Sequence, residues 1–293
     1  MLDEVLRHLR CPVCHASLSA TAAGLRCPAG HAFDRAAQGY VNLLAKPAAN
    51  AGDSAAMLAA RARFLGQGHF DPLARTLVEL AGRHAAPAGL LVEVGAGTGH
   101  YLARVLDGLP GRPGLAVDVS KHAARRAARA HARMAAIVAD VHGTLPLTDQ
   151  SAALLLDVFA PRNGPELRRV LRPEGALLVV TPQPRHLAEL RAVAGLLEVD
   201  PDKGRRLAET LDPYLEREPP VPLSWNMALD RTAVGLLVAM GPSARHIDAS
   251  LLAGRLAALP DRTQVTAAVE VHVGRPRRGR FRWKGRPLPE RRQ

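Results

Sequence analysis

The 293-residue sequence is poor in aromatic residues, which make up 3% of it, so aliphatic side chains must fill its core. Its three cysteines cannot form a closed set of disulfides, which favours a reducing compartment and the use of thiols for metal binding. No apolar run reaches the roughly 18 residues of a membrane span, and charged residues interrupt the opening MLDEVLRHLR. We therefore expect a cytoplasmic location, with no signal peptide and no membrane-spanning helix.

Lysine is also rare, with four residues against 35 arginines, and the basic charge is unevenly distributed. The net charge is +12, but residues 274–293 carry nine basic residues and one acid, a balance of +8, which leaves +4 for the other 273 residues. This Pro/Gly/Arg-rich tail cannot build a core, so we predict that it is disordered. It suits contacts with phosphate groups, and the alternative is a solvated extension with no defined role.

The three cysteines and one histidine form the pattern C-x2-C-x12-C-x3-H near the N-terminus. Soft thiolates and an imidazole, four ligands in all, suit a closed and therefore structural Zn²⁺ site. A unit of fewer than 40 residues needs such a metal to fold. We expect a zinc-binding module over residues 1–38; the alternatives are three unrelated buried thiols, or His15 as a competing ligand. The predicted ligands are Cys11, Cys14, Cys27 and His31.

Residues 87–273 alternate short apolar runs with helical stretches, which is typical of parallel βαβ units. The predicted strands are 90–94, 115–119, 135–139, 153–159, 176–181, 222–229 and 264–273, with late helices at 232–240 and 249–259. The first five are almost wholly apolar, as strands covered on both faces are. The pattern predicts a Rossmann-like α/β sheet of about seven strands. Residues 39–86, with helical patterns at 55–66 and 70–84, are interpreted as a helical connector.

The first predicted strand ends in GAGTG, a G-x-G-x-G turn rather than the dinucleotide G-x-G-x-x-G. Alternate glycines allow a tight turn and leave room for an adenosyl or amino-acid group above the strand end. An aspartate closes each of the next two strands, where one can accept both ribose hydroxyls and the other can meet the adenine. The set favours S-adenosylmethionine over NAD; the alternative is a tight turn with two helix-capping aspartates. The predicted cofactor residues are Gly95, Gly97, Thr98, Gly99, Asp118, Asp140 and Val141.

Two further motifs are distinctive, GHAFD followed by GYVNLL, and PQPRHL. Together with GDSAAMLAARARFLGQGHF and VEVGAGTGHYLARVL, they resemble bacterial 23S rRNA guanine-N1 methyltransferases. The closest resemblance is to the actinomycete branch that confers resistance to tylosin and mycinamicin. The resemblance implies a class I methyltransferase fold with S-adenosylmethionine as cofactor. It also implies a homodimer whose zinc modules border an RNA cleft.

The resemblance assigns roles residue by residue. The three cysteines and His31 match the zinc ligands of the family, and Gly97 and Thr98 match its cofactor contacts. Phe70 stands where the family commonly has a tyrosine, so a stacking role is retained and a hydroxyl contact is not. His186, in PQPRHL, matches a histidine on the cofactor side. Taken alone, the last two would more often be core or surface residues.

The implied reaction methylates N1 of a guanine in a 23S rRNA hairpin loop that lines the macrolide region of the ribosomal exit tunnel. N1 of neutral guanine carries a proton, so a base near the methyl group would help, and the guanine must first be splayed out of its stack. Asp157, at the end of the fourth strand, is a candidate base, and His142 is another. Asn163 or Arg162 could stabilise charge on O6.

Arginines gather on two predicted helices, and we interpret them as part of a phosphate-binding surface, although a solvated face is the common meaning of such clusters. They are Arg61, Arg63, Arg125, Arg126, Arg129 and Arg133. Two other functions remain open at this point. One is a small-molecule methyltransferase of antibiotic biosynthesis, and the other is a non-enzymatic zinc-ribbon protein that binds RNA.

Overall fold

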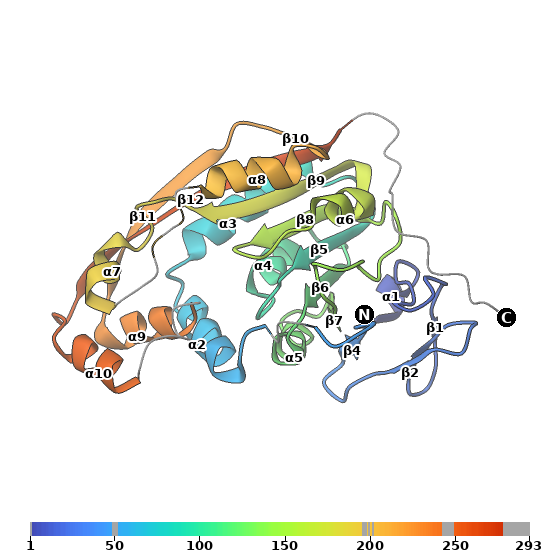
Figure 1. Ribbon diagram of the computed structural model, residues 1–293, viewed down its shortest axis with the longest axis horizontal. Helices are drawn as coiled ribbons and strands as arrows, with labels where there is room; N and C mark the ends of the chain where they lie inside the picture. The colour runs from blue at the N-terminus through green and yellow to red at the C-terminus, as the bar shows by residue number, and fades with distance from the viewer. Residues whose placement is uncertain are drawn as a thin grey trace.

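A single mixed sheet of nine strands runs through the molecule (Figure 1), in a computed structural model that describes residues 2–48, 52–194, 198, 200, 202–241 and 249–277. Its main path is β10-β12-β9-β8-β5-β6-β7-β4, and β11 also pairs with β12. The strands are β4 (Val41–Asn42), β5 (Leu90–Val94), β6 (Gly114–Asp118), β7 (Met134–Val138), β8 (Ala152–Val158), β9 (Leu171–Pro182), β10 (Leu215–Arg217), β11 (Val221–Leu229) and β12 (Thr263–Pro276).

Strands β4 to β9 are parallel where they pair, whereas β12 runs antiparallel to β9 and β11 runs antiparallel to β12. Every residue of β5, β7 and β8 is buried, which explains why their sequences are apolar runs without alternation. The seven predicted strands are confirmed. Because β6 and β8 lie on opposite sides of β5, the strand order reverses there, and ligands bind at the carboxyl ends of strands at such a point.

Two boundaries differ from the sequence prediction. The segment 39–86 is not purely a helical connector, since Val41 is fully buried and pairs with Ile137 to form an edge strand of the main sheet. A strand of two residues has no periodicity by which it could be recognised. At the other end, β12 continues to Pro276, three residues into the predicted tail. Residues 278–293 of that tail lie outside the described residues.

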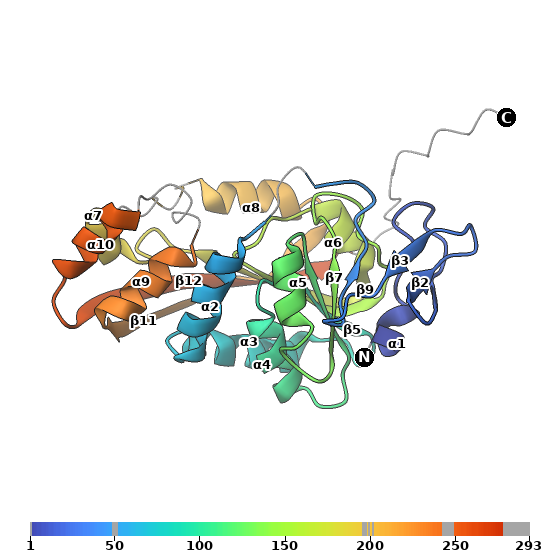
Figure 2. The same ribbon diagram turned by 90° about the horizontal axis from the view of Figure 1, so that it is seen from below.

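Helices cover both faces of the sheet (Figure 2). The helices whose side chains pack against one face of the sheet are α2 (Ala55–Gly66), α3 (Asp71–His84), α4 (His100–Gly108), α5 (Lys121–Ala127) and α9 (Arg231–Ala239). Those on the other face are α1 (Leu2–Leu6), α6 (Gly164–Val170) and α8 (Lys203–Leu211). Helices α7 (Ala188–Ala194) and α10 (Ala249–Ala257) lie near α9 at one end of the molecule (Figure 1).

The cysteine-bearing unit lies at the opposite end and contains the antiparallel strands β1 (Ser19–Ala20), β2 (Gly24–Arg26) and β3 (Ala32–Asp34). It shares a hydrophobic core with the sheet, in which Val5 and Leu9 are buried together with Val92 and Val117. No helix in the described part of the chain has the length and apolar character that crossing a bilayer requires.

The connection from β7 to β8, residues 139–151, contains no helix, unlike the crossovers β5 to β6, β6 to β7 and β8 to β9. The N-terminal unit covers the sheet beside it, and its backbone is bonded to the connection: Arg10 N–H donates to the Pro146 carbonyl at 3.0 Å, and Thr148 N–H donates to that of His8 at 2.8 Å. The guanidinium group of Arg169 in α6 donates hydrogen bonds to two carbonyls of the connection, those of Leu145 and Leu147. The N-terminal unit therefore takes the place of a crossover helix.

Candidate functional site

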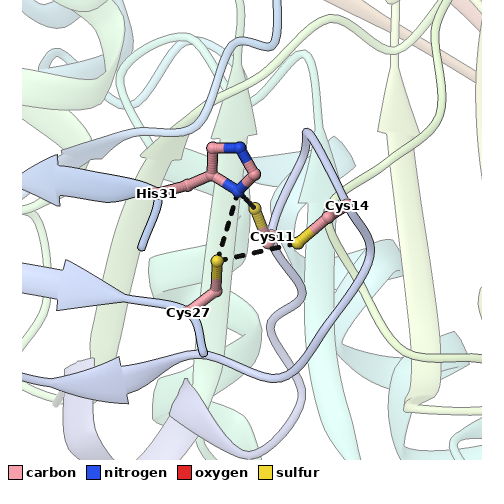
Figure 3. Close-up of side chains that lie close together, drawn as sticks. All are labelled: Cys11, Cys14, Cys27 and His31. Atoms are coloured by element: carbon pink, nitrogen blue, oxygen red, sulfur yellow. Dashed lines mark hydrogen bonds between the residues drawn. The ribbon is translucent and has the colours of Figure 1, made fainter. Parts of the chain in front are cut away.

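Three thiols and an imidazole converge in the N-terminal unit (Figure 3). The Sγ of Cys27 lies 3.6 Å from the Sγ of Cys14 and 3.3 Å from the Nδ1 of His31, and the Sγ of Cys11 lies 3.6 Å from the same Nδ1. All four ligand atoms lie within 4.8 Å of one another. Ligands about 2.3 Å from a tetrahedral Zn²⁺ lie roughly 3.7 Å apart. The geometry and the donor set of three sulfurs and one nitrogen therefore fit zinc, and His15 is not part of the cluster.

Two short turns bring these ligands together. In the first, Cys11 N–H donates to the Ala16 carbonyl at 2.8 Å, and His15, with a φ of 59°, lets the chain reverse after the second cysteine. In the second, Gly30 has a φ of 87° and donates to the carbonyl of Cys27 at 3.0 Å. A left-handed conformation is easily adopted by glycine, which explains the glycine beside this ligand pair.

The GAGTG turn follows β5 at the reversal point of the sheet. Its glycines have φ values of 64° (Gly95), 54° (Gly97) and 76° (Gly99), all in the left-handed region. A Cβ on Gly95 would lie 2.4 Å from the Cβ of Ala160, so the loops after β5 and β8 approach closely. The turn leaves little room for side chains of its own, which is the property needed of a cradle for a ligand.

Asp118, at the end of β6, fixes this turn. One carboxylate oxygen accepts from the Gly97 N–H and the other from the Ser120 N–H, each at 2.8 Å. Burial raises the pKa of this carboxyl group. Each oxygen retains a second lone pair, so the predicted contacts with ribose hydroxyls remain chemically open. Asp140 is arranged similarly after β7, where it accepts from the His142 N–H at 2.9 Å.

Glu93, one residue before the end of β5, is a buried acid beside the glycine turn that the sequence interpretation missed. It is buried, and its Oε2 accepts from the N–H of Leu102 at 3.1 Å. Leu102 lies in the first turn of α4, whose N-cap is Gly99 and has no side chain to satisfy these amides. Burial raises the pKa of Glu93 to about 8, so the carboxyl group is mainly protonated at neutral pH. A lone acid in the apolar strand LLVEV was the available signal.

Arg61 lies over the glycine turn and is half-buried, unlike Arg63 on the same helix, and its predicted part in binding RNA stays a prediction. Its Nη1 lies 2.6 Å from Oδ2 of Asp53, and its Nη2 donates to the carbonyl of Met240 at 2.8 Å. A Cβ on Gly97 would lie 2.8 Å from the same Nη1. The guanidinium group and the Asp53 carboxylate thus form an ion pair at the edge of the predicted cofactor pocket.

The other predicted arginines divide into two groups. The guanidinium of Arg133 donates to three carbonyls at and beyond the C-terminus of α4, those of Leu106, Leu109 and Arg112. Such carbonyls lack partners within the helix. The side chains that are exposed are those of Arg63, Arg125, Arg126 and Arg129. Their role in binding RNA stays a prediction.

Asp157, the penultimate residue of β8, is fully buried beside two cations. The Nη2 of Arg162 lies 3.3 Å from its Oδ1, an ion pair that leaves both carboxylate oxygens without a well-directed side-chain hydrogen bond. Burial raises the pKa of Asp157 to about 7, although Arg162 and Lys203 oppose the shift. Burial and the neighbouring Arg162 lower the pKa of Lys203. The carboxyl group can therefore exchange a proton near neutral pH.

A cavity of about 370 Å³ lies beside this pair, at the same edge of the sheet. It is lined by residues that follow β7 and β8, among them His142, Arg162 and Asn163, and by Thr210 and Tyr214 from the region of α8. The Asn163 amide already donates to the carbonyls of His142 and Gly143, at 3.1 and 3.2 Å. The structure thus brings three predicted substrate-side residues together, and it gives Asn163 a part in fixing the loop after β7.

Phe70 and His186, the two residues matched only through the resemblance, are neighbours. Their ring centroids are 6.4 Å apart, edge to face. Phe70 is only 2% exposed and also packs on Trp225, so it is a core aromatic next to the site. The Nδ1 of His186 accepts from the Ala268 N–H at 3.1 Å, and burial lowers the pKa of this histidine to about 4, which keeps it neutral. Their cofactor contacts stay predictions.

Comparison with known proteins agrees with both parts of the molecule. The family model described as RlmA, N-terminal, a zinc ribbon, matches residues 9–49. A 23S rRNA (guanine(748)-N(1))-methyltransferase of Streptomyces fradiae is 52% identical over 279 residues, which is 94% of this chain and 99% of the relative. A Micromonospora griseorubida protein, provisionally named a 23S rRNA (guanine-N(1)-)-methyltransferase, is 50% identical over 294 residues, 94% of this chain and 100% of the relative.

The strand order, the antiparallel last pair of strands and the glycine turn at the reversal point define a class I fold of S-adenosylmethionine-dependent methyltransferases, extended by an N-terminal zinc ribbon. With half of its residues identical to those of relatives over nearly their whole length, the chain belongs to the family of 23S rRNA (guanine-N1-)-methyltransferases. The resemblance recognised in its motifs is thereby confirmed.

Proposed function

We propose that the protein methylates N1 of guanine 748 in 23S rRNA, in the cytoplasm, and thereby protects its host from macrolides of the tylosin and mycinamicin type. The observation that carries this proposal is the 52% identity to the Streptomyces fradiae enzyme, whose name specifies that position. A small-molecule substrate would leave the exposed arginines without a role. A purely structural RNA-binding protein would not need the glycine turn braced by Asp118.

The cofactor belongs at the carboxyl ends of β5, β6 and β7. Gly95, Gly97, Thr98 and Gly99 would form the cradle beneath it, Asp118 would receive the ribose hydroxyls, and Asp140 with the Val141 backbone would meet the adenine. We assign the ion pair of Arg61 and Asp53 to the zwitterionic amino-acid end, since each member matches one of its charges. Bound there, S-adenosylmethionine supplies an electrophilic methyl group on its sulfonium.

The substrate side of the crevice lies at the end of β8. Arg162 would donate to O6 of the guanine and stabilise the negative charge that develops there as N1 loses its proton. Asp157, whose pKa is about 7, would accept that proton once Arg162 turns towards O6. The N1–methyl bond forms as the sulfur–methyl bond breaks, and the electron pair of that bond stays on sulfur. Positioning of the two reactants supplies the rest of the rate enhancement.

RNA would lie across the edge that carries these groups, with the exposed arginines Arg63, Arg125, Arg126 and Arg129 on phosphates. We further propose a homodimer, in which the zinc ribbon borders the RNA cleft. Light scattering during size-exclusion chromatography would then give twice the chain mass of 31.2 kDa.

The decisive experiment maps the modified base. The protein is incubated with S-adenosylmethionine and unmodified 23S rRNA, and primer extension is expected to stop next to guanine 748, because N1 methylation blocks pairing. The Gly97→Arg variant, whose new side chain would collide with Arg61, is the inactive control. A stop elsewhere would redirect the proposal to another base, and methyl transfer only to small molecules would overturn it.

A further inference from the structure

Phe159 stands out among the apolar side chains of the described residues. Four large hydrophobic residues there are exposed, and Phe159, at 42%, is the only aromatic one. In a chain with so few aromatic rings, Phe64 and Phe70 are by contrast buried in the core. Packing therefore does not account for the position of this ring.

The backbone of Phe159 is also strained. Its φ is 57°, in the left-handed region that residues other than glycine and asparagine rarely adopt. Among the non-glycine residues in the described part of the chain, three others share this property: His15, Gln150 and Leu187. A bulky residue held in this conformation costs free energy, and such costs are concentrated at functional sites.

The strain has a geometric consequence. Had β8 continued in the extended form, Phe159 would point to the same side as Asp157, because side chains two apart in a strand share a face. Instead its N–H donates to the Val180 carbonyl at 3.3 Å, and its ring lies against His186, with centroids 5.9 Å apart and planes tilted by 34°. His186 is fixed by the Ala268 N–H at its Nδ1. The phenyl ring thus has one supported face and one open face, two residues from Asp157.

We propose that Phe159 is the platform on which the extruded target base stacks, with the left-handed backbone presenting its ring to the crevice. The inference rests on the proposed function, since it takes an RNA purine as the substrate. A flat apolar ring supported by a neutral imidazole matches the face of a purine, and base–aromatic stacking is a common means of holding an unpaired base. Arg162 and Asp157 would then meet the edge of the same base.

The test compares Phe159→Trp and Phe159→Tyr with Phe159→Leu and Phe159→Gly. The aromatic variants are expected to retain methylation of a 23S rRNA hairpin that contains guanine 748. The leucine and glycine variants should lose about 5- to 100-fold in kcat/KM for RNA, with the Kd of S-adenosylhomocysteine unchanged by calorimetry. Because glycine relieves the strain, the Tm of Phe159→Gly should equal or exceed that of the unaltered protein. Val221→Ala, at another exposed apolar residue, is the matched control.

The outcomes separate the two proposals. If the unaltered protein methylates the hairpin and Phe159→Leu is as active as Phe159→Trp, the platform is refuted while the proposed function stands. A drop in the Tm of Phe159→Gly by several degrees would make Phe159 a packing residue and also refute it. If the unaltered protein binds S-adenosylhomocysteine but methylates no rRNA, the proposed function fails, and the platform for an RNA base fails with it.

Discussion

Single side chains decide the chemistry of this crevice, and the ion pair between Arg61 and Asp53 is the clearest case. The pair spans 2.6 Å, and the guanidinium group also holds the end of α9 through the carbonyl of Met240. Arg61 therefore connects α2, the segment before it and α9 at the edge of the glycine turn. An arginine in this position can exchange a protein carboxylate for that of a ligand without losing its charge partner.

We predict that Arg61→Met weakens S-adenosylhomocysteine binding by about 10- to 100-fold, the value of a hydrogen bond to a charged group. Binding of methylthioadenosine, which lacks the amino-acid end, should be unaffected. Calorimetry with both ligands measures the difference, and Arg63→Met, an exposed arginine on the same helix, is the control. Equal losses for the two ligands would show that Arg61 supports the pocket as a whole and does not bind the amino-acid end.

Residue identity and spacing predicted much of this site, but not the pairings that depend on tertiary structure. The four zinc ligands are close in sequence and have a fixed spacing, and the glycine turn occupies five consecutive positions. The Arg61 contact with Met240 joins residues 179 positions apart, so a cluster of arginines looked like a basic face. The exposure and left-handed backbone of Phe159 have no sequence signal, because nothing about an isolated phenylalanine indicates a positive φ.

At the scale of elements, α4 is held at both ends by side chains from outside it. Glu93 of β5 accepts from the N–H of Leu102 in the first turn, and Arg133 donates to the carbonyls at and beyond the last turn. This arrangement compensates for an N-cap glycine that is needed for the cofactor turn and cannot cap the helix itself. The turn and the helix behind it are thereby positioned from within the sheet.

Glu93 should make stability fall as pH rises. The folded protein keeps this proton up to about pH 8, whereas the unfolded chain releases it near the ordinary value of 4.5. The contribution of this proton to the free energy of unfolding is therefore complete below pH 4.5. It is lost as the pH rises towards 8, by up to about 1.4 kcal/mol per pH unit. Glu93→Gln keeps the shape of the side chain but does not titrate. Between pH 5.5 and 7.5 its free energy of unfolding should therefore rise, relative to that of the unaltered protein, with that slope.

Urea unfolding of both proteins at several pH values measures this difference, in which the titration of all other groups cancels. The expected result is that the two stability curves diverge as pH rises. Parallel curves would mean that Glu93 is ionised in the folded state, held by a counter-charge.

At the scale of the whole molecule, the zinc ribbon and the methyltransferase sheet are joined by packing and by hydrogen bonds. They share a hydrophobic core, and backbone hydrogen bonds join the ribbon to the helix-less connection between β7 and β8. Zinc at the cluster of three cysteines and one histidine should therefore stabilise the sheet as well as the ribbon. The sequence pattern nevertheless separated the ribbon as a module of its own, because hydrophobic periodicity does not reveal which surface a segment packs against.

Removal of zinc should lower the Tm of the whole protein by at least about 10 °C, since structural zinc sites contribute several kcal/mol to folding. The expected trace is one transition, moved to lower temperature by a chelator or by Cys14→Ser, with weaker S-adenosylhomocysteine binding. Val13→Ser, an exposed residue in the same turn, is the control and should leave both unchanged. Two separate transitions, with the main one unmoved, would mean that the ribbon folds independently.

Because the ribbon occupies the place of a crossover helix, the metal supports the methyltransferase fold itself as well as the border of the proposed RNA cleft. A fragment that begins after the ribbon would expose the apolar face of the sheet that the ribbon covers. We would expect it to precipitate rather than act as a minimal catalyst. If the protein confers macrolide resistance as proposed, zinc starvation of the host should restore its sensitivity to the unaltered antibiotic.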